Sequence, residues 1–115
     1  MQAAVWPDGR GVLSHETALD LHRLCDVSPN HIDITTPRDY RTHREVPAGY
    51  RLHRRALADE DVTLLEGLPI VTPAQAIADG IEIGLRRTLI DQAIETARRE
   101  AMITRATAER LRTVR

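Results

Sequence analysis

The stretch GVLSHETALDLHRL (residues 11–24) decides how the rest of the chain is arranged. Gly11 and the two apolar residues after it are typical of a short strand or turn. Ser14 follows at the expected N-cap position, where its side chain can accept a hydrogen bond from a free backbone N–H group of the next turn. Glu16 places negative charge in the first turn, where the helix dipole favours it. One apolar stripe then continues at helical spacing: Ala18, Leu21, His22 and Cys25. The stretch therefore predicts a short extended segment, a cap and a buried helix.

Length and composition limit what the chain can do. Its 115 residues suit one domain, which we assign to residues 1–115. All sixteen basic residues are arginine, and this absence of lysine excludes a phosphate-binding P-loop and Schiff-base chemistry. The single cysteine, Cys25, excludes a disulfide framework. Because no run of about eighteen apolar residues and no signal-peptide pattern occurs, we expect a cytoplasmic protein without a membrane partner.

Four segments after the first helix have the composition of strands. Residues 31–35 and 50–54 alternate between two classes of side chain, as a half-buried strand does. Residues 62–65 and 68–71 flank a Glu-Gly pair, a pattern typical of a hairpin. We expect these segments to form a small antiparallel sheet of about four strands.

The C-terminal half predicts three helices. TPAQ (residues 72–75) is a capping box with proline at the first helical position, and the helix should end near Gly84. A second helix should begin at Leu85, and Thr104 should cap a third. Their predicted apolar faces comprise Ala74, Ile77, Ala78, Ile81, Leu89, Ile90, Ala93, Ile94, Ala97, Ala108, Leu111 and Val114. Because Pro69 lacks a backbone donor, its strand should lie at a sheet edge or begin at the proline. A helix, then strands, then helices indicate an α+β fold.

Charge changes sign from segment to segment. Residues 1–37 hold two arginines against five acids and residues 56–85 hold six acids and no arginine. Residues 38–55 hold six arginines against two acids, and residues 86–115 hold eight against four. The net charges of these four segments, in chain order, are therefore −3, +4, −6 and +4.

The basic segment 38–55 is the best candidate for a binding surface. Guanidinium groups bind phosphate and carboxylate through two hydrogen bonds, so this segment suits nucleic acid or an acidic partner. We define the arginine block as Arg38, Arg41, Arg44, Arg51, His53 and Arg55. Its last three members should project from one strand face. The alternative is a solvated surface that pairs with the acidic residues 59–61.

The histidines and Ser14 do not predict a metal or catalytic site. His15 and His22 would lie about 10 Å apart along a helix, too far to share one ion. His22 and Cys25 are close enough, but no second pair follows at zinc spacing. Ser14 and His15 are neighbours, whose side chains should point apart, and Ser14 is assigned to the cap. We therefore expect no catalytic residue, no metal, no cofactor and no enzymatic activity.

As a string, residues 11–24 resemble the opening of the second domain of AbiEi-type antitoxins, which belong to type IV toxin–antitoxin systems. The resemblance continues in order through IDITTPR (residues 32–38), LHR (52–54), DV (61–62), GLPIVTP (67–73) and AD (78–79). It spans about Val12 to Leu111, and the order and spacing of the motifs carry it rather than any single motif.

The resemblance implies a non-enzymatic antitoxin domain that contributes to neutralising a nucleotidyltransferase-like toxin and to autoregulatory DNA binding. Such antitoxins place a winged helix-turn-helix before this region, whereas only about a dozen residues precede Ser14 here. We therefore expect the second domain alone, with weak DNA binding of its own. Two alternatives remain: a nucleic-acid-binding regulatory module without a toxin partner, and an accessory domain of a nuclease-like protein.

Overall fold

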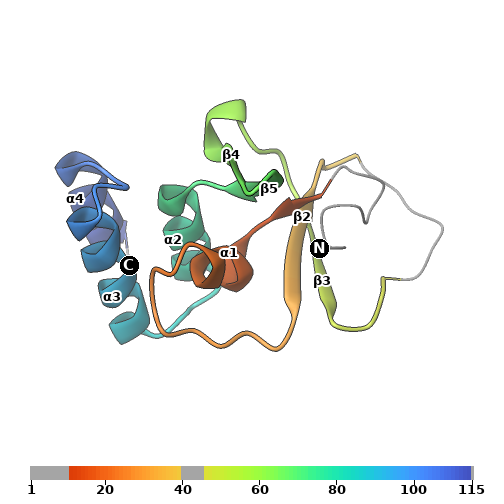
Figure 1. Cartoon of the computed structure of the whole chain (residues 1–115), viewed down its shortest axis with the longest axis horizontal. Coiled ribbons are helices and arrows are strands. Elements are labelled where there is room, and N and C mark those ends of the chain that lie inside the picture. The colour runs from red at the N-terminus through yellow and green to blue at the C-terminus, as the bar shows by residue number, and fades with distance from the viewer. Residues whose placement is uncertain (1–10, 40–45, 115) are drawn as a thin grey trace.

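The computed structural model describes residues 11–39 and 46–114, and its four α-helices and five strands form an α+β fold (Figure 1). The strands are β1 (Val12–Leu13), β2 (Ile32–Thr36), β3 (Tyr50–Arg54), β4 (Val62–Leu65) and β5 (Leu68–Val71). The α-helices are α1 (His15–Leu21), α2 (Pro73–Glu82), α3 (Arg87–Arg99) and α4 (Arg105–Val114), and a short 3-10 helix, η1, covers Asp59–Asp61. The α+β class expected from the sequence is confirmed.

The sheet is larger than predicted, and it is mixed rather than antiparallel. Its strand order is β3-β2-β1-β5-β4. β1 lies at the centre, antiparallel to β2 and parallel to β5, while β2 and β3 are parallel along their whole length. The sequence predicts a short strand or turn at residues 12–13, but two residues are too few to show an alternating pattern that would place β1 in the sheet. The long connection 37–49 allows β3 to run parallel to β2, which a tight hairpin would forbid.

The β4–β5 hairpin forms as predicted, with Leu65 opposite Leu68. Glu66 and Gly67 have φ values of 50° and 83°, the backbone that a two-residue type I′ turn requires. The prediction that Pro69 places its strand at an edge or begins it is wrong, because β5 begins one residue earlier and lies between β4 and β1. In the antiparallel pair of β4 and β5, hydrogen-bonded and non-hydrogen-bonded positions alternate, and the nitrogen of Pro69 points away from β4. It points toward β1, which pairs with β5 only at Ile70.

The helices lie in succession on one side of the sheet (Figure 1). α1 packs against β2 and α2, and α2 packs in turn against α3 and α4. Gly80 of α2 permits this close packing, because a Cβ there would lie 3.1 Å from the Cδ1 atom of Ile90 and 3.2 Å from that of Leu19. The core between these elements is aliphatic: Leu13, Leu19, Leu24, Ile34, Ile70, Val71, Ile77, Ile90 and Ile94 are its largest apolar side chains.

Most predicted helix boundaries hold, but two expectations fail. α1 is only seven residues long and ends at Leu21, so His22 is its C-cap and Cys25 lies beyond it. The turn follows at Arg23, whose φ of 57° is left-handed and incompatible with a continued helix. Val114, predicted to face the core, is 62% exposed at the end of α4. No helix within residues 11–39 and 46–114 is long and apolar enough to cross a membrane.

The cap of α2 gives a first prediction. The Thr72 hydroxyl accepts a hydrogen bond from the backbone N–H of Gln75 at 3.3 Å, as the capping box predicts. Thr72→Ala should lower the free energy of unfolding by about 1 kcal/mol, because that N–H loses its acceptor. Thr72→Ser, which keeps the hydroxyl, is the matched control. Urea unfolding with equal midpoints for the two variants would show that the cap does not stabilise the fold.

Candidate functional site: a buried polar network beside a pocket

Polar side chains gather where the sheet meets α1 and α2. Ser14, His15, Asp33, Thr35 and Asp79 are each no more than 3% exposed, although residues of these types are usually found at the surface. Hydrogen bonds join them to four further side chains. We call the whole set the polar network: Ser14, His15, His31, Asp33, Thr35, His53, Arg55, Gln75 and Asp79.

The strongest contact in the network joins Arg55 to Asp79. The two Nη atoms of Arg55 donate to the two carboxylate oxygens at 2.5 and 2.8 Å, the bidentate geometry that arginine and carboxylate favour. Gln75 Nε2, one turn earlier on α2, donates to the same carboxylate at 2.9 Å. The hydrogen bond from Arg55 to Asp79 is the main reason that the pKa of Arg55 is raised. The pair ties the segment after β3 to the middle of α2.

Asp33 of β2 holds the second buried carboxylate. His53 Nε2 donates to its Oδ1 at 2.9 Å, and His31 Nε2 donates to its Oδ2 at 3.1 Å. Burial alone would raise the pKa of Asp33, but the hydrogen bond from His53 and the nearby histidines outweigh burial and lower it. Asp33 therefore stays ionised and holds the ring of His53 against the sheet.

A line of hydroxyl groups connects Arg55 to His15. Arg55 Nη2 donates to Thr35 Oγ1 at 3.3 Å, and the Thr35 hydroxyl donates to Ser14 Oγ at 2.8 Å. Ser14 Oγ lies 2.7 Å from Nδ1 of His15, whose ring stacks on His53 at 3.8 Å between centroids. Burial lowers the pKa of His15 to about 4, against the opposing charge of Asp79. The line of hydrogen bonds ends at His15, because the Nδ1 atom of a neutral imidazole ring accepts the hydrogen of the Ser14 hydroxyl.

Two expectations about Ser14 and His15 are wrong. Ser14 occupies the N-cap position, but its side chain makes no capping hydrogen bond and joins the network instead. The two neighbouring side chains do not point apart, because His15 has a φ of 54°. This left-handed backbone, rare for a residue with a side chain, turns the imidazole back toward Ser14.

The contact between Ser14 and His15 still does not make a nucleophile and base. In a serine hydrolase the hydroxyl and the carboxylate contact opposite ring nitrogens of the histidine. Here His15 Nδ1 faces both Ser14 Oγ at 2.7 Å and Asp79 Oδ2 at 3.9 Å. Ser14 is also fully buried, with 0% exposed, so a substrate has no access to its hydroxyl. The geometry suits a structural role for this pair.

The histidines and Cys25 are the side chains that could ligate a metal. Within residues 11–39 and 46–114, no group of three or more His, Cys, Asp or Glu side chains is arranged to hold a metal ion. His22 instead donates from Nε2 to the carbonyl of Val71 at 2.8 Å. Burial raises the pKa of the Cys25 thiol, which disfavours the thiolate that a metal would need.

A pocket of about 660 Å³ opens beside the network, at the ends of β2 and β3. It is lined by Val12, Thr35, Thr36, Pro37, Arg38, Asp39, Arg55, Ala56, Leu57 and Val62. Two polar atoms among these residues are buried and have no hydrogen-bond partner within residues 11–39 and 46–114: Thr36 Oγ1 and Arg55 Nε. Native proteins leave few buried polar atoms unpaired, so these two are exceptions to that rule.

The arginine block is divided by the structure. Arg38 and Arg51 are exposed, and Arg41 and Arg44 lie outside the described residues. His53 and Arg55 face inward and belong to the polar network, so they are not available as simple surface contacts. The carboxylate that binds Arg55 is not in the predicted acidic segment 59–61, although the charge of Asp61 contributes to the raised pKa of Arg55.

Three important residues were missed from sequence: Asp33, Thr36 and Asp79. Asp79 left no readable signal, since it lies on the side of the helix away from the predicted apolar face of Ala74, Ile77, Ala78 and Ile81, whereas the structure buries it together with Ala76, Ile77 and Gly80. Comparison with known proteins gives these residues no assigned role: no protein-family model matches the chain, and the search of curated proteins found no match. Their roles therefore follow from geometry.

The central ion pair gives a second prediction. Asp79→Ala leaves Arg55 and Gln75 without their acceptor in a buried site and should lower the free energy of unfolding by about 3 kcal/mol. The control Asp59→Ala removes an exposed acid from the segment that the sequence offered as an alternative partner, and should change the free energy of unfolding by less than about 0.5 kcal/mol. Urea unfolding measures both. Equal effects of the two substitutions would place the partner of Arg55 in the acidic segment and contradict the bidentate pair.

The third prediction concerns pH. The pKa of His15 falls from 6.5 in the unfolded chain to about 4 in the fold, so between these values the unfolded chain binds more protons. Lowering the pH from 7 to 4 should therefore remove about 3 kcal/mol of stability through this residue. His15→Gln should flatten the pH dependence over this window, whatever its stability at pH 7. Parallel curves of unfolding free energy against pH for both proteins would contradict the assignment.

Proposed function

We propose that this chain is a non-enzymatic domain of the AbiEi-type antitoxin kind, which contributes to toxin neutralisation and to autoregulatory DNA binding. One observation supports the resemblance: motifs far apart in the sequence contribute neighbouring side chains to one polar network. Ser14 and His15 come from the first motif, Thr35 from the second, His53 from the third and Asp79 from the last.

The use of these side chains supports a role without catalysis. Asp33 and Asp79, the two buried carboxylates, are held by hydrogen bonds from His31, His53, Arg55 and Gln75. A general acid or base needs an accessible group with a pKa near the working pH, whereas Asp33 has a lowered pKa and Asp79 is 1% exposed. The motif residues thus hold the sheet against α1 and α2.

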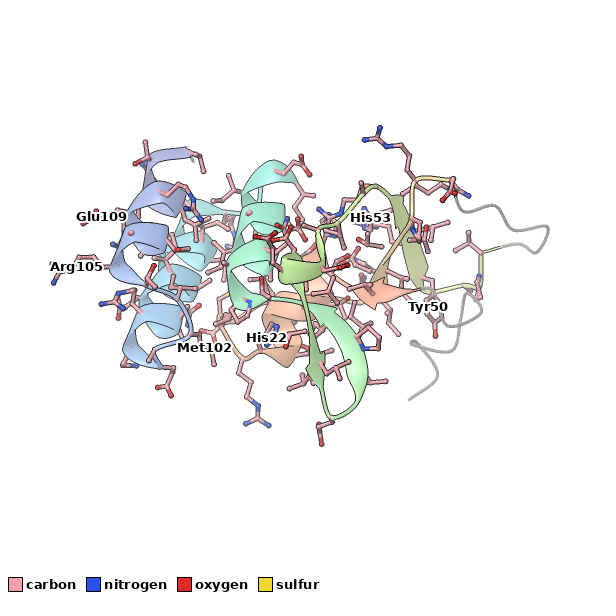
Figure 2. The ribbon with its side chains drawn as sticks, turned by 90° about the horizontal axis from the view of Figure 1, so that it is seen from above. His22, Tyr50, His53, Met102, Arg105 and Glu109 are labelled. Atoms are coloured by element: carbon pink, nitrogen blue, oxygen red, sulfur yellow. The ribbon has the colours of Figure 1, made fainter. Side chains whose placement is uncertain are left out.

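A partner would then bind at the protein surface, and the members of the arginine block that do not face inward are the best candidates for contacting it. β3, which carries the exposed Arg51, lies at the end of the molecule opposite α4 (Figure 2, where Tyr50 and Arg105 mark the two ends). The block without its inward-facing members comprises Arg38, Arg41, Arg44 and Arg51. These arginines would contact the acidic surface of a toxin, or DNA phosphates when the antitoxin represses its own promoter.

The fourth prediction tests this surface with a charge-matched pair of variants. Arg41, Arg44 and Arg51 are changed to Gln in one variant. The control changes Arg105, Arg110 and Arg112, three exposed arginines on α4, to Gln and so removes the same charge. The first variant should bind the cognate nucleotidyltransferase-like toxin of this proposal at least about tenfold more weakly, while the control should bind nearly as well as wild type.

Growth and salt dependence complete the test. Co-expression of the wild-type chain or the control should rescue cells from the toxin, whereas the block variant should rescue them poorly. With duplex DNA, each phosphate that the variant no longer neutralises should flatten the slope of log affinity against log salt by about 0.9. Binding to DNA but never to the toxin would favour a regulatory module without a toxin partner. Equal binding by all three proteins would show that the block is solvated surface.

A further inference from the structure

β4 is an edge strand of the sheet. The strand order β3-β2-β1-β5-β4 leaves one side of β4 without a neighbouring strand among the described residues. The N–H and C=O groups of such an edge are a template for pairing with another chain, and proteins cover an edge or blunt it with charge where pairing would be harmful. The β4–β5 hairpin projects from the molecule (Figure 2), and Thr63 and Leu64 of β4 are exposed. This edge is therefore open to a further strand.

The register identifies the backbone groups that point outward from β4. Leu65 and Leu68 close the two-residue turn as a hydrogen-bonded pair, and Thr63 and Ile70 form the next such pair. Leu64 lies between these pairs, so its N–H and C=O both point away from β5. Neither group has a backbone partner within the part of the chain that the structure describes. A residue placed opposite in an antiparallel strand would exchange two hydrogen bonds with it.

The side chain of Leu64 adds an apolar contact at the same position. It is 67% exposed, the largest fraction of any large apolar side chain that the structure describes. Apolar residues directly opposite each other on one face of an antiparallel pair stabilise the sheet. The edge thus offers backbone groups for affinity and a side chain for selectivity, the combination used in strand addition by peptide-binding domains.

Acidic residues flank β4 at both ends. The 3-10 helix η1 places Asp59, Glu60 and Asp61 immediately before the strand, and Glu66 follows it in the turn. If two copies paired antiparallel through Leu64, Asp61 of each would lie near Glu66 of the other, and like charges would oppose the pairing. The same charges would attract a basic strand. Charge therefore selects a basic segment of another protein rather than a second β4.

Nearby cations do not cancel this negative charge. Arg23 lines a cavity at the turn of the hairpin, but Asp20 lines the same cavity. On the other face, the pocket that reaches the start of β4 is lined by both Arg38 and Asp39. Arg55 lines that pocket too, but its charge is balanced by the buried carboxylate that it binds. The four acids around β4 therefore set the sign of the charge at this edge.

We propose that β4 binds a short, basic, extended segment of a partner protein as an added antiparallel strand. The main chain of the segment pairs with the N–H and C=O of Leu64, and an apolar residue of the segment lies opposite the Leu64 side chain. Basic residues two positions to either side meet Asp61 and Glu66. The site is separate from the arginine block and does not depend on the antitoxin proposal, because it rests on the free edge and its charge.

The experiment titrates the isotope-labelled full chain with the peptide acetyl-Arg-Thr-Val-Thr-Arg-amide and follows it by NMR. The valine of this peptide is meant to lie opposite Leu64, with one arginine toward each acidic flank. Binding should shift the Leu64 amide signal saturably and slow its hydrogen exchange, with about millimolar affinity for so short a ligand. The Thr63 amide, which is already paired within the hairpin, is the internal reference and should change its exchange much less.

Two altered peptides separate strand addition from simple charge attraction. Methylation of the valine nitrogen removes the donor that meets the Leu64 carbonyl and keeps both arginines, so it should weaken binding at least about fivefold. Replacement of both arginines by glutamate keeps the backbone groups but reverses the charge, and should abolish measurable binding at low salt.

A charge-matched pair of protein variants tests the acidic flank. Glu66→Gln should weaken binding of the arginine peptide about two- to threefold, because one opposite charge across the added strand is lost. Glu109→Gln removes the same charge from an exposed position on α4, remote from β4 in sequence, and should bind the peptide as wild type does.

Slow exchange of the Leu64 amide in the free protein would overturn the proposal, because the edge would already be occupied. Protection that is independent of protein concentration would place another segment of this chain there, and protection that rises with concentration would place a second copy there. Equal affinity of the methylated and unmethylated peptides would reduce the contact to charge attraction. Absence of a saturable shift at Leu64 would show that β4 does not accept a strand.

Discussion

The fold depends above all on the contact between Arg55 and Asp79. Asp79 lies in the middle of α2, 1% exposed and surrounded by helix faces that are otherwise aliphatic. An isolated carboxylate in such a place is strongly disfavoured, so α2 can pack here only if a cation reaches it. Arg55 follows the edge strand β3 and supplies that cation from the sheet. The pair thus fixes the position of α2 relative to the far edge of the sheet, which a non-directional aliphatic core without phenylalanine would specify less sharply.

The neighbouring polar groups follow from this one requirement. Arg55 has donors to spare after binding Asp79, and it uses one for Thr35, which in turn orders Ser14. The left-handed backbone of His15 then becomes tolerable, because the imidazole it directs inward meets both Ser14 and the face of His53. His53 is held in place by Asp33 on the next strand. Each buried polar group is therefore stabilised by the next, and the strain at His15 is compensated by contacts that a regular helix start would lack.

Local patterns in the sequence were reliable wherever a neighbour along the chain decides the structure. The cap at Thr72, the turn at Glu66-Gly67 and the buried stripe of α3 depend on residues a few positions apart, and all three were predicted. Contacts between residues far apart in the sequence were not predicted. β1 is too short to show a period, and its central place in the sheet is set by partners far away in sequence, at positions 34 and 70. Arg55 was interpreted as a surface charge because its partner is 24 residues further on and not in the nearest acidic segment.

Arg55 also carries one buried donor that the network does not use. Its Nη atoms bind a carboxylate of the network, whereas its Nε is buried and has no partner among the described residues. These two observations have one cause: the guanidinium group is rigid and planar, so holding the Nη atoms on Asp79 fixes the direction of the Nε–H bond. The ion pair that sets the packing of α2 therefore also fixes the direction of this buried donor.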